Sequence, residues 1–154
     1  MFPIYNLFEF LHIAAFIVWI GCVVALSIIN VRLAREQDRA ALVALSRQSD
    51  FYGRAILGPA AGITLITGIV MVAVLGLGFG TLWIVWGLVG VFGSLVLGVA
   101  LIRRATAELS ALAPTVAPND PRVIALQQRL ATLSTINLLL LLSAVWAMVF
   151  KPTL

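Results

Sequence analysis

Charged residues are scarce in this sequence of 154 residues: they make up 10% of the chain, whereas hydrophobic residues make up 62%. A water-soluble domain is usually about a quarter charged. The mean hydropathy of +1.12 is correspondingly high. These values exclude an ordinary soluble globular protein and indicate an integral membrane protein.

Cysteine, histidine and lysine each occur once, as Cys22, His12 and Lys151. A single cysteine excludes an intramolecular disulfide and a cysteine-rich metal site, so we interpret Cys22 as a small packing residue. The sequence has no G-x-x-x-x-G-K, H-E-x-x-H or C-x-x-C motif. Serine hydrolysis is disfavoured because His12 is the only histidine that could act as its base.

Four long apolar runs are present, at about residues 7–30, 55–77, 81–102 and 134–150. Each is long enough to cross about 30 Å of hydrocarbon as a helix, and none alternates as a barrel strand would. The first run is not a cleavable signal peptide, because Met1 to Leu11 carries Glu9 and no basic residue. We therefore predict an all-α integral membrane four-helix bundle, with residues 1–154 forming one transmembrane domain.

All nine arginines lie in two segments, 31–54 and 103–133. With four crossings these segments share one face, and the positive-inside rule places them in the cytoplasm with both termini outside. We expect a multi-pass protein of the bacterial inner membrane. The acidic residues Glu36, Asp38, Asp50, Glu108 and Asp120 dilute the basic charge, so the net charge of +4 does not indicate nucleic-acid binding.

Two helices are expected to extend beyond the membrane on the arginine-rich side. Asn119, Asp120 and Pro121 form a helix start signal. An apolar stripe then predicts an amphipathic helix that runs into the fourth span; it consists of Val123, Leu126, Leu130 and Leu133. We interpret residues 32–50 as an amphipathic extension of the first helix.

Polar side chains recur at helical spacing within two spans, and ionisable groups in a span usually face the protein interior. On the first helix the inward stripe is Glu9, His12, Phe16, Trp19, Val23, Ser27 and Asn30. On the last helix, continuing the three-four rhythm predicts Asn137, Leu140, Ala144, Met148 and Lys151. Both stripes should point into the bundle.

Glycines are concentrated in the second and third spans, where Gly58-x-x-x-Gly62 and Gly90-x-x-x-Ser94-x-x-x-Gly98 occur. Small residues at this spacing let helices approach closely. The pattern favours helix packing. It also leaves open a homodimer or partner membrane protein bound through these helices, or room for a flat cofactor.

Three roles fit His12. It can be a structural residue paired with Glu9 or Lys151, or an axial ligand of haem b. The sixth ligand would then be Met148, Met71 or His12 of a second copy. In the third role His12 binds copper together with Met71 and Met148, because thioethers suit Cu(I). Several unusual side chains are predicted on the outer half of the bundle with His12, including Glu9, Trp19, Met71, Met148 and Lys151.

Five segments together resemble an uncharacterised family of small bacterial four-helix inner-membrane proteins: Leu7–His12, Ile17–Gly21, Thr67–Ile69, Gly78–Ile84 and Trp146–Pro152. The first-helix pattern around His12 and Trp19 is also similar to copper-resistance D membrane domains and to J-type protoporphyrinogen oxidases. That resemblance implies a haem-associated histidine at His12, with Lys151 as counterpart of the lysine in the oxidases.

These observations lead to one main functional hypothesis and two alternatives. The main hypothesis is a small, redox-associated membrane protein that binds haem against His12 in the outer half. The first alternative is a non-enzymatic accessory or scaffold protein in which Glu9, His12 and Lys151 are structural. The second alternative is copper handling.

Overall fold

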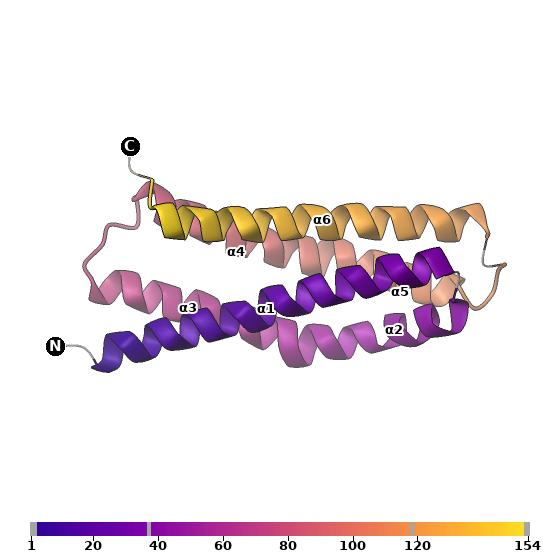
Figure 1. Cartoon of the computed structure of the whole chain (residues 1–154), viewed down its shortest axis with the longest axis horizontal. Coiled ribbons are helices and arrows are strands. Elements are labelled where there is room, and N and C mark those ends of the chain that lie inside the picture. Colours follow the sequence, from indigo (N-terminus) through magenta and orange to yellow (C-terminus); the bar gives the residue numbers. More distant parts are fainter. Residues whose placement is uncertain (1–2, 37, 118, 153–154) are drawn as a thin grey trace.

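The computed structural model describes residues 3–36, 38–117 and 119–152, which contain helices and no strand. The described part of the chain is therefore all-α, as predicted (Figure 1). The elements are α1 (Pro3–Glu36), α2 (Arg39–Tyr52), η1 (Gly53–Leu57), α3 (Gly58–Val74), α4 (Leu82–Val96), η2 (Leu97–Ile102), α5 (Arg103–Leu112) and α6 (Pro121–Phe150). The short segments η1 and η2 are single turns of π-helix.

These elements join into four long helical rods. The helical backbone is continuous from α2 through η1 to α3, and from α4 through η2 to α5. Within the described residues, four helices are long and apolar enough to cross a membrane: Ile4–Leu33, Val43–Val74, Leu82–Leu112 and Pro121–Phe150. The prediction of four membrane-length apolar helices is confirmed, and each helix continues past its apolar run. The bounds of the membrane spans stay a prediction.

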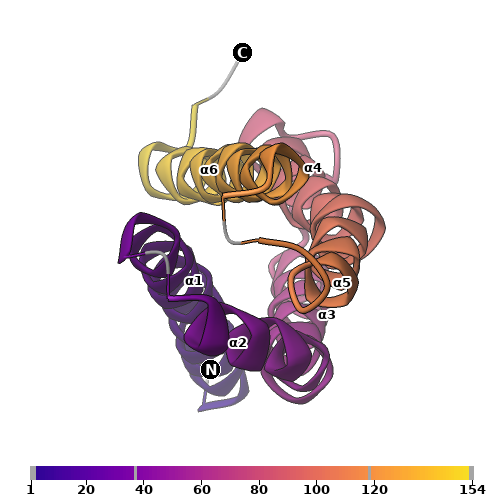
Figure 2. The ribbon, with the colours of Figure 1, turned by 90° about the vertical axis from the view of Figure 1, so that its right-hand side faces the viewer.

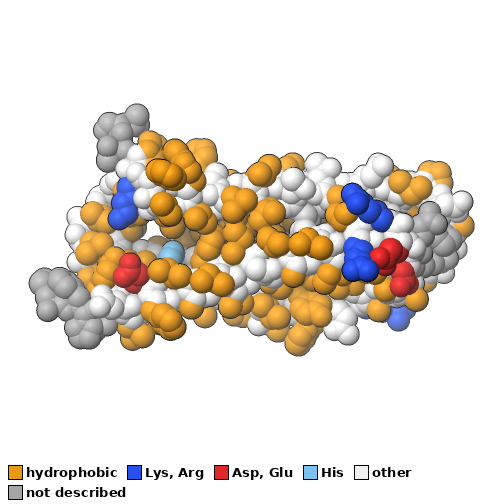
Figure 3. Space-filling model, in the orientation of Figure 1, with side chains coloured by type: hydrophobic (Ala, Val, Ile, Leu, Met, Phe, Trp, Pro, Cys, Tyr) orange, Lys and Arg blue, Asp and Glu red, His pale blue; other side chains and the backbone are white. Residues whose placement is uncertain are grey.

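The rods lie along a common axis (Figure 1). We call the end where Pro3 and Pro152 lie the terminal end. The opposite end, where α1 is followed by α2 and α5 by α6, is the arginine end. Figure 3 shows basic and acidic side chains gathered toward the arginine end, whereas apolar side chains cover much of the bundle between the two ends. This apolar exterior is suited to contact with lipid.

The predicted continuation of the first helix through residues 32–50 is wrong. Helix α1 ends at Glu36, and α2 begins at Arg39 and returns along α1. The carboxylate of Asp38 accepts a hydrogen bond from the backbone N–H of Ala41, 3.0 Å away. This is the geometry of a helix N-cap, so a start signal within the segment separates the two helices.

The predicted start of the last long helix is confirmed at Pro121. Asp120 is the N-cap, and its Oδ1 accepts from the backbone N–H of Arg122 at 2.9 Å. The guanidinium of Arg122 donates to both oxygens of the same carboxylate, at 3.1 and 3.0 Å. From this cap α6 runs without interruption to Phe150.

The Asp120 cap should make the start of α6 depend on pH. Hydrogen bonds from the side chain of Arg122, and then from its backbone N–H, lower the pKa of Asp120. A carboxyl group whose folded pKa is depressed stabilises the fold above its unfolded pKa, and the contribution disappears as the pH falls through the folded pKa. The protection of the Arg122 and Val123 amides, taken relative to the slower intrinsic exchange at low pH, should therefore fall on acidification. The Asp120→Asn variant retains a capping side chain but has no titrating group, so the protection of these amides should no longer depend on pH in this way. An equally steep loss of protection in that variant would contradict the role of Asp120 as a pH-dependent cap.

The long helices pack in two pairs, α1 with α3 and α4 with α6, and α1 also contacts α6. Helices α3 and α4 are consecutive but touch each other least among the contacting pairs. Figure 2, viewed along the bundle from the arginine end, shows α6 beside α4 and α1 beside α2. Near mid-bundle, the buried core includes Trp19, Val23 and Leu141.

A second buried cluster lies under the arginine end and joins α5 to the start of α6. It contains Ala105, Leu109, Ala113, Val123 and Leu130. Two members of the stripe predicted on residues 123–133, Val123 and Leu130, are thus buried against protein. The contact explains how residues beyond the apolar run remain helical.

Candidate functional site

Three glycines of α4 allow this helix to approach α6 closely. A Cβ atom at Gly87 would lie 2.6 Å from Cε of Met148, and one at Gly90 would lie 2.7 Å from Cβ of Ala144. At Gly93 it would lie 2.8 Å from Cδ2 of Leu140. Real Cβ atoms do not tolerate such contacts, so each glycine admits a side chain of α6. Gly90 of the pattern in the third span, together with Gly87 and Gly93, therefore serves packing within one chain.

Homodimerisation through glycines of the second and third spans stays a prediction. A Cβ atom at Gly62 or Gly98 would meet nothing within 4 Å in the described chain. Gly62 has room for a contact, in contrast to Gly90, whereas the open space beside Gly98 belongs to a cavity inside the bundle. A second copy or a partner membrane protein would have to use a position such as Gly62.

The inward stripes predicted on the first and last spans agree with the burial except at their outer ends. Trp19 and Val23 are buried on α1, and Asn137 and Ala144 on α6. Glu9 and Lys151 are exposed. Lys151 lies beyond the end of α6, where the helical rhythm no longer applies. Glu9 is within α1 but toward the terminal end, where α1 and α6 diverge.

His12 is half-buried on α1 and faces α3. Its Nδ1 lies 3.1 Å from Oγ1 of Thr67. A Cβ atom at Gly68 would lie 3.1 Å from Cε1 of the ring. The imidazole therefore rests against the one backbone position of α3 that leaves room for it, beside a hydroxyl group.

The hydrogen bonds of Thr67 determine which ring nitrogen of a neutral His12 carries the proton. The hydroxyl of Thr67 has one hydrogen, and its Oγ1 lies 2.6 Å from the carbonyl oxygen of Ile63. A carbonyl can only accept, so the hydroxyl donates to Ile63 and its oxygen accepts from Nδ1–H of His12. We infer that Nε2 carries the lone pair, which is the form in which an imidazole binds a metal ion.

Figure 3 shows that the surface is hollowed between α1 and α6 toward the terminal end, and the only histidine of the chain lies in this hollow. Helices α1 and α6 diverge toward the same end (Figure 1). We call this region the His12 hollow. Nε2 is the ring nitrogen of His12 that Thr67 does not contact.

The other predicted site residues are distributed around this end of the bundle. Met71 is half-buried on α3, one helical turn beyond Thr67 and on the same face of that helix. Met148 contacts Gly87. The ammonium of Lys151 lies 5.6 Å from the ring centroid of Trp83, as a cation–π contact.

The structure therefore brings His12 together with Thr67, whereas Lys151 contacts Trp83. The buried Trp19 packs edge to face on Phe16, with ring centroids 6.1 Å apart. Within the described residues, no group of three or more His, Cys, Asp or Glu side chains could hold a metal ion. Any metal bound at His12 would therefore need a ligand set other than such a cluster, as haem provides.

Sequence reasoning missed the roles of Thr67 and Gly68. Both belong to the segment that carries the family resemblance, but helical periodicity does not show which residue of another span faces His12. A threonine followed by glycine within an apolar span is a weak signal for such a partner, because it pairs a hydroxyl with a gap in the helix surface.

Four membrane-length helices, packed as two pairs with an apolar exterior, define an integral membrane protein of the helical-bundle class. The family described as "Predicted integral membrane protein (DUF2269)" matches residues 6–152, and the chain belongs to it. No curated protein matches the chain. No solved structure matches it either. The predicted membership of an uncharacterised membrane family is confirmed, whereas similarity to copper-resistance D domains and J-type oxidases stays a prediction.

Proposed function

We propose that this protein binds haem b in the His12 hollow and takes part in electron transfer at the membrane. The observation that supports the proposal is the hydrogen-bond chain from His12 through Thr67 to Ile63. It leaves Nε2 as the basic nitrogen of a neutral imidazole. Ligating histidines typically donate their other ring N–H to a fixed acceptor, which sets the tautomer and the ring orientation.

The residues around His12 fit this role. Thr67 orients the ring, and Gly68 lets it lie close to α3. Met71, on the same face of α3 as Thr67, would be the residue to supply a further ligand to the iron, because Met148 is packed against Gly87. When bound, haem supplies one-electron redox chemistry; the protein contributes the ligand and an apolar surrounding.

The proposed orientation follows from the arginines. The positive-inside rule puts the arginine end in the cytoplasm of a bacterial cell and the terminal end on the outer side. The His12 hollow would then open toward the outer half of the inner membrane. A redox partner would have to approach from that side or from within the bilayer.

The test is an absorption spectrum of the protein, expressed with a supply of haem and purified in detergent. We expect a Soret band in the wild type and its loss in His12→Ala. Thr67→Val removes the acceptor of Nδ1–H and should weaken haem affinity by about 10–100-fold, as changes in such supporting residues do. The matched control is Thr135→Val, because Thr135 is exposed and makes the same bond to the carbonyl four residues back, at 2.9 Å.

Absence of a Soret band in the wild type, or an unchanged band in His12→Ala, would overturn the proposal. If haem does not bind, the alternative is an accessory or scaffold protein. The hydrogen bond between His12 and Thr67 supports that alternative, because it joins α1 to α3. A colourless protein whose His12→Ala variant melts at a lower temperature would support this alternative.

Copper handling has less support, because Met71 and Met148 lie on helices of different pairs. Stoichiometric copper that is lost in Met148→Leu would favour it.

A further inference from the structure

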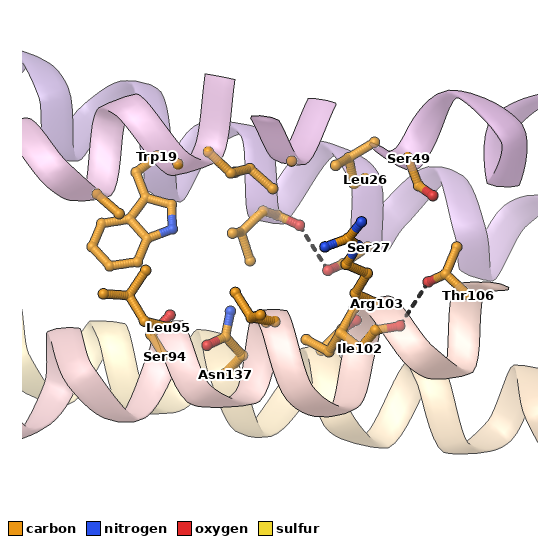
Figure 4. A pocket seen from close by; sticks show the side chains of 18 of the residues that line it. Trp19, Leu26, Ser27, Ser49, Ser94, Leu95, Ile102, Arg103, Thr106 and Asn137 are labelled. Carbon is orange, nitrogen blue, oxygen red and sulfur yellow. Dashed lines mark hydrogen bonds between the residues drawn. The ribbon is translucent and has the colours of Figure 1, made fainter. Parts of the chain in front are cut away.

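A separate cavity of about 270 Å³ lies between mid-bundle and the arginine end. All four long helical rods contribute to its wall. Figure 4 shows Trp19, Ser94 and Asn137 toward one end of it, and Arg103 and Thr106 toward the other. The cavity shares no lining residue with the contacts of His12 described above, so an inference from it does not depend on haem binding.

Asn137 is the most informative residue of this wall. Its side chain is 4% exposed. Its Oδ1 is buried and has no hydrogen-bond partner among the described residues. A buried amide atom without a partner is costly and rare in folded proteins. Exchanging the amide oxygen and nitrogen would leave a polar atom at the same place, so in either orientation Asn137 needs a polar partner that the described residues do not supply.

Two arginines also line the cavity, Arg54 in η1 and Arg103 at the start of α5. Figure 4 places Arg103 at the end opposite Trp19 and Asn137. In Figure 4 the side chain of Arg103 extends into the cavity toward α1. A guanidinium binds carboxylates and phosphates through paired N–H groups. The arginine pair therefore favours an anionic group at this end.

The wall between these two ends is largely apolar and contains Val23, Leu26, Leu57 and Leu95. Ser94 and Arg103 are nine residues apart along one continuous rod, which corresponds to about 13 Å of helix. Both π-helical turns, η1 and η2, contribute residues to the wall. Such turns are frequent at functional sites.

We propose that this cavity binds a small amphipathic organic acid that carries a second oxygen function. The acid group lies at Arg54 and Arg103, the apolar body lies along Val23 and Leu57, and the second oxygen hydrogen-bonds to Asn137. The ligand enters from the arginine end, where the two guanidinium groups are exposed. Each chemical feature of the ligand corresponds to one part of the wall.

The experiment uses the full chain in lipid nanodiscs and measures ligand binding by equilibrium dialysis. Empty nanodiscs are the control for partitioning of the probe into lipid. The probes are 10-hydroxydecanoate, decanoate and 1-decanol, which differ only in the acid and in the second oxygen. We expect saturable binding of one molecule per chain, with affinity decreasing from 10-hydroxydecanoate to decanoate to 1-decanol. Equal binding of all three probes, or no saturable binding above empty nanodiscs, would overturn the proposal.

Two substitutions test the two polar ends of the cavity separately. Asn137→Leu should weaken 10-hydroxydecanoate at least tenfold, to the affinity of decanoate, and leave decanoate unchanged. Arg103→Gln should weaken both acids at least tenfold and leave 1-decanol unchanged; Arg54→Gln serves as a second variant if Arg103→Gln does not fold. A purely structural role for either residue would change all three probes together, and that result would contradict the assignment.

A matched glycine pair tests the place of binding. Gly98 lines the cavity, and a Cβ atom there would meet nothing within 4 Å. Gly21 is equally open but lies on the exposed face of α1. Gly98→Leu should abolish binding of 10-hydroxydecanoate, whereas Gly21→Leu should retain it. Unchanged binding in Gly98→Leu would show that the probe binds elsewhere.

Discussion

Gly90→Ala is expected to destabilise the bundle by about 1–3 kcal/mol, the usual cost of overpacking a well-packed interior. The added Cβ atom would lie 2.7 Å from Cβ of Ala144. One of the two helices has to move to relieve this contact. Because α4 and α6 form one of the two main helix pairs, the displacement affects half of the bundle.

The same contact predicts a rescue. In the double variant Gly90→Ala with Ala144→Gly, the methyl group is transferred from α6 to α4, and the close approach is restored. Unfolding by denaturing detergent, followed by circular dichroism, should show recovery of much of the lost stability. Gly21→Ala is the control, since nothing lies within 4 Å of a Cβ atom there. If the double variant were no more stable than Gly90→Ala, packing at this contact would not be the cause.

Trp19→Ala should cost about 3–5 kcal/mol, as removal of a large buried aromatic side chain does. Trp19 is 3% exposed and belongs to the mid-bundle core with Val23 and Leu141. The substitution removes the indole from inside the bundle, where it packs on Phe16 and forms one end of the cavity. Lipid is as apolar as the core, so the lost free energy comes mainly from packing contacts rather than from transfer out of water.

Trp146→Ala is the control for this substitution. Trp146 is 54% exposed, so much of its surface faces the exterior and its removal leaves no internal void of similar size. Thermal unfolding in detergent should show a large decrease in melting temperature for Trp19→Ala and a much smaller one for Trp146→Ala. Equal decreases in the two variants would contradict the assignment of Trp19 to the core.

The burial pattern shows how far helical periodicity alone predicts an interior. The stripe from Val123 to Ala144 points inward through most of α6, including the polar Asn137. Periodicity succeeded there because a helix is rigid over several turns and one face must pack. It failed at Lys151, where α6 has ended and the backbone is left-handed, with φ of 45°.

The candidate site was predictable only in part. His12 was identified as the unusual residue of the first span, but its partner Thr67 is 55 residues away in the chain. The glycines of α4 were identified as a packing surface, yet their neighbours proved to be side chains of α6. Arg54 and Arg103 were assigned only to the two arginine-rich cytoplasmic segments, and the structure shows that both lie in helical segments that line a cavity.

The sequence by itself determined that the chain is an all-α integral membrane protein with four apolar helices of membrane length, and where α6 begins. These properties depend on local hydropathy, helical period and capping, each of which involves residues close together in the chain. The tertiary structure decided that α1 pairs with α3 and α4 with α6, and with it the contact of His12 with Thr67 and the cavity around Asn137. In an apolar span, faces that meet lipid and faces that meet protein have the same hydropathy. Only the fit of small and large side chains between helices distant in sequence selects the pairs.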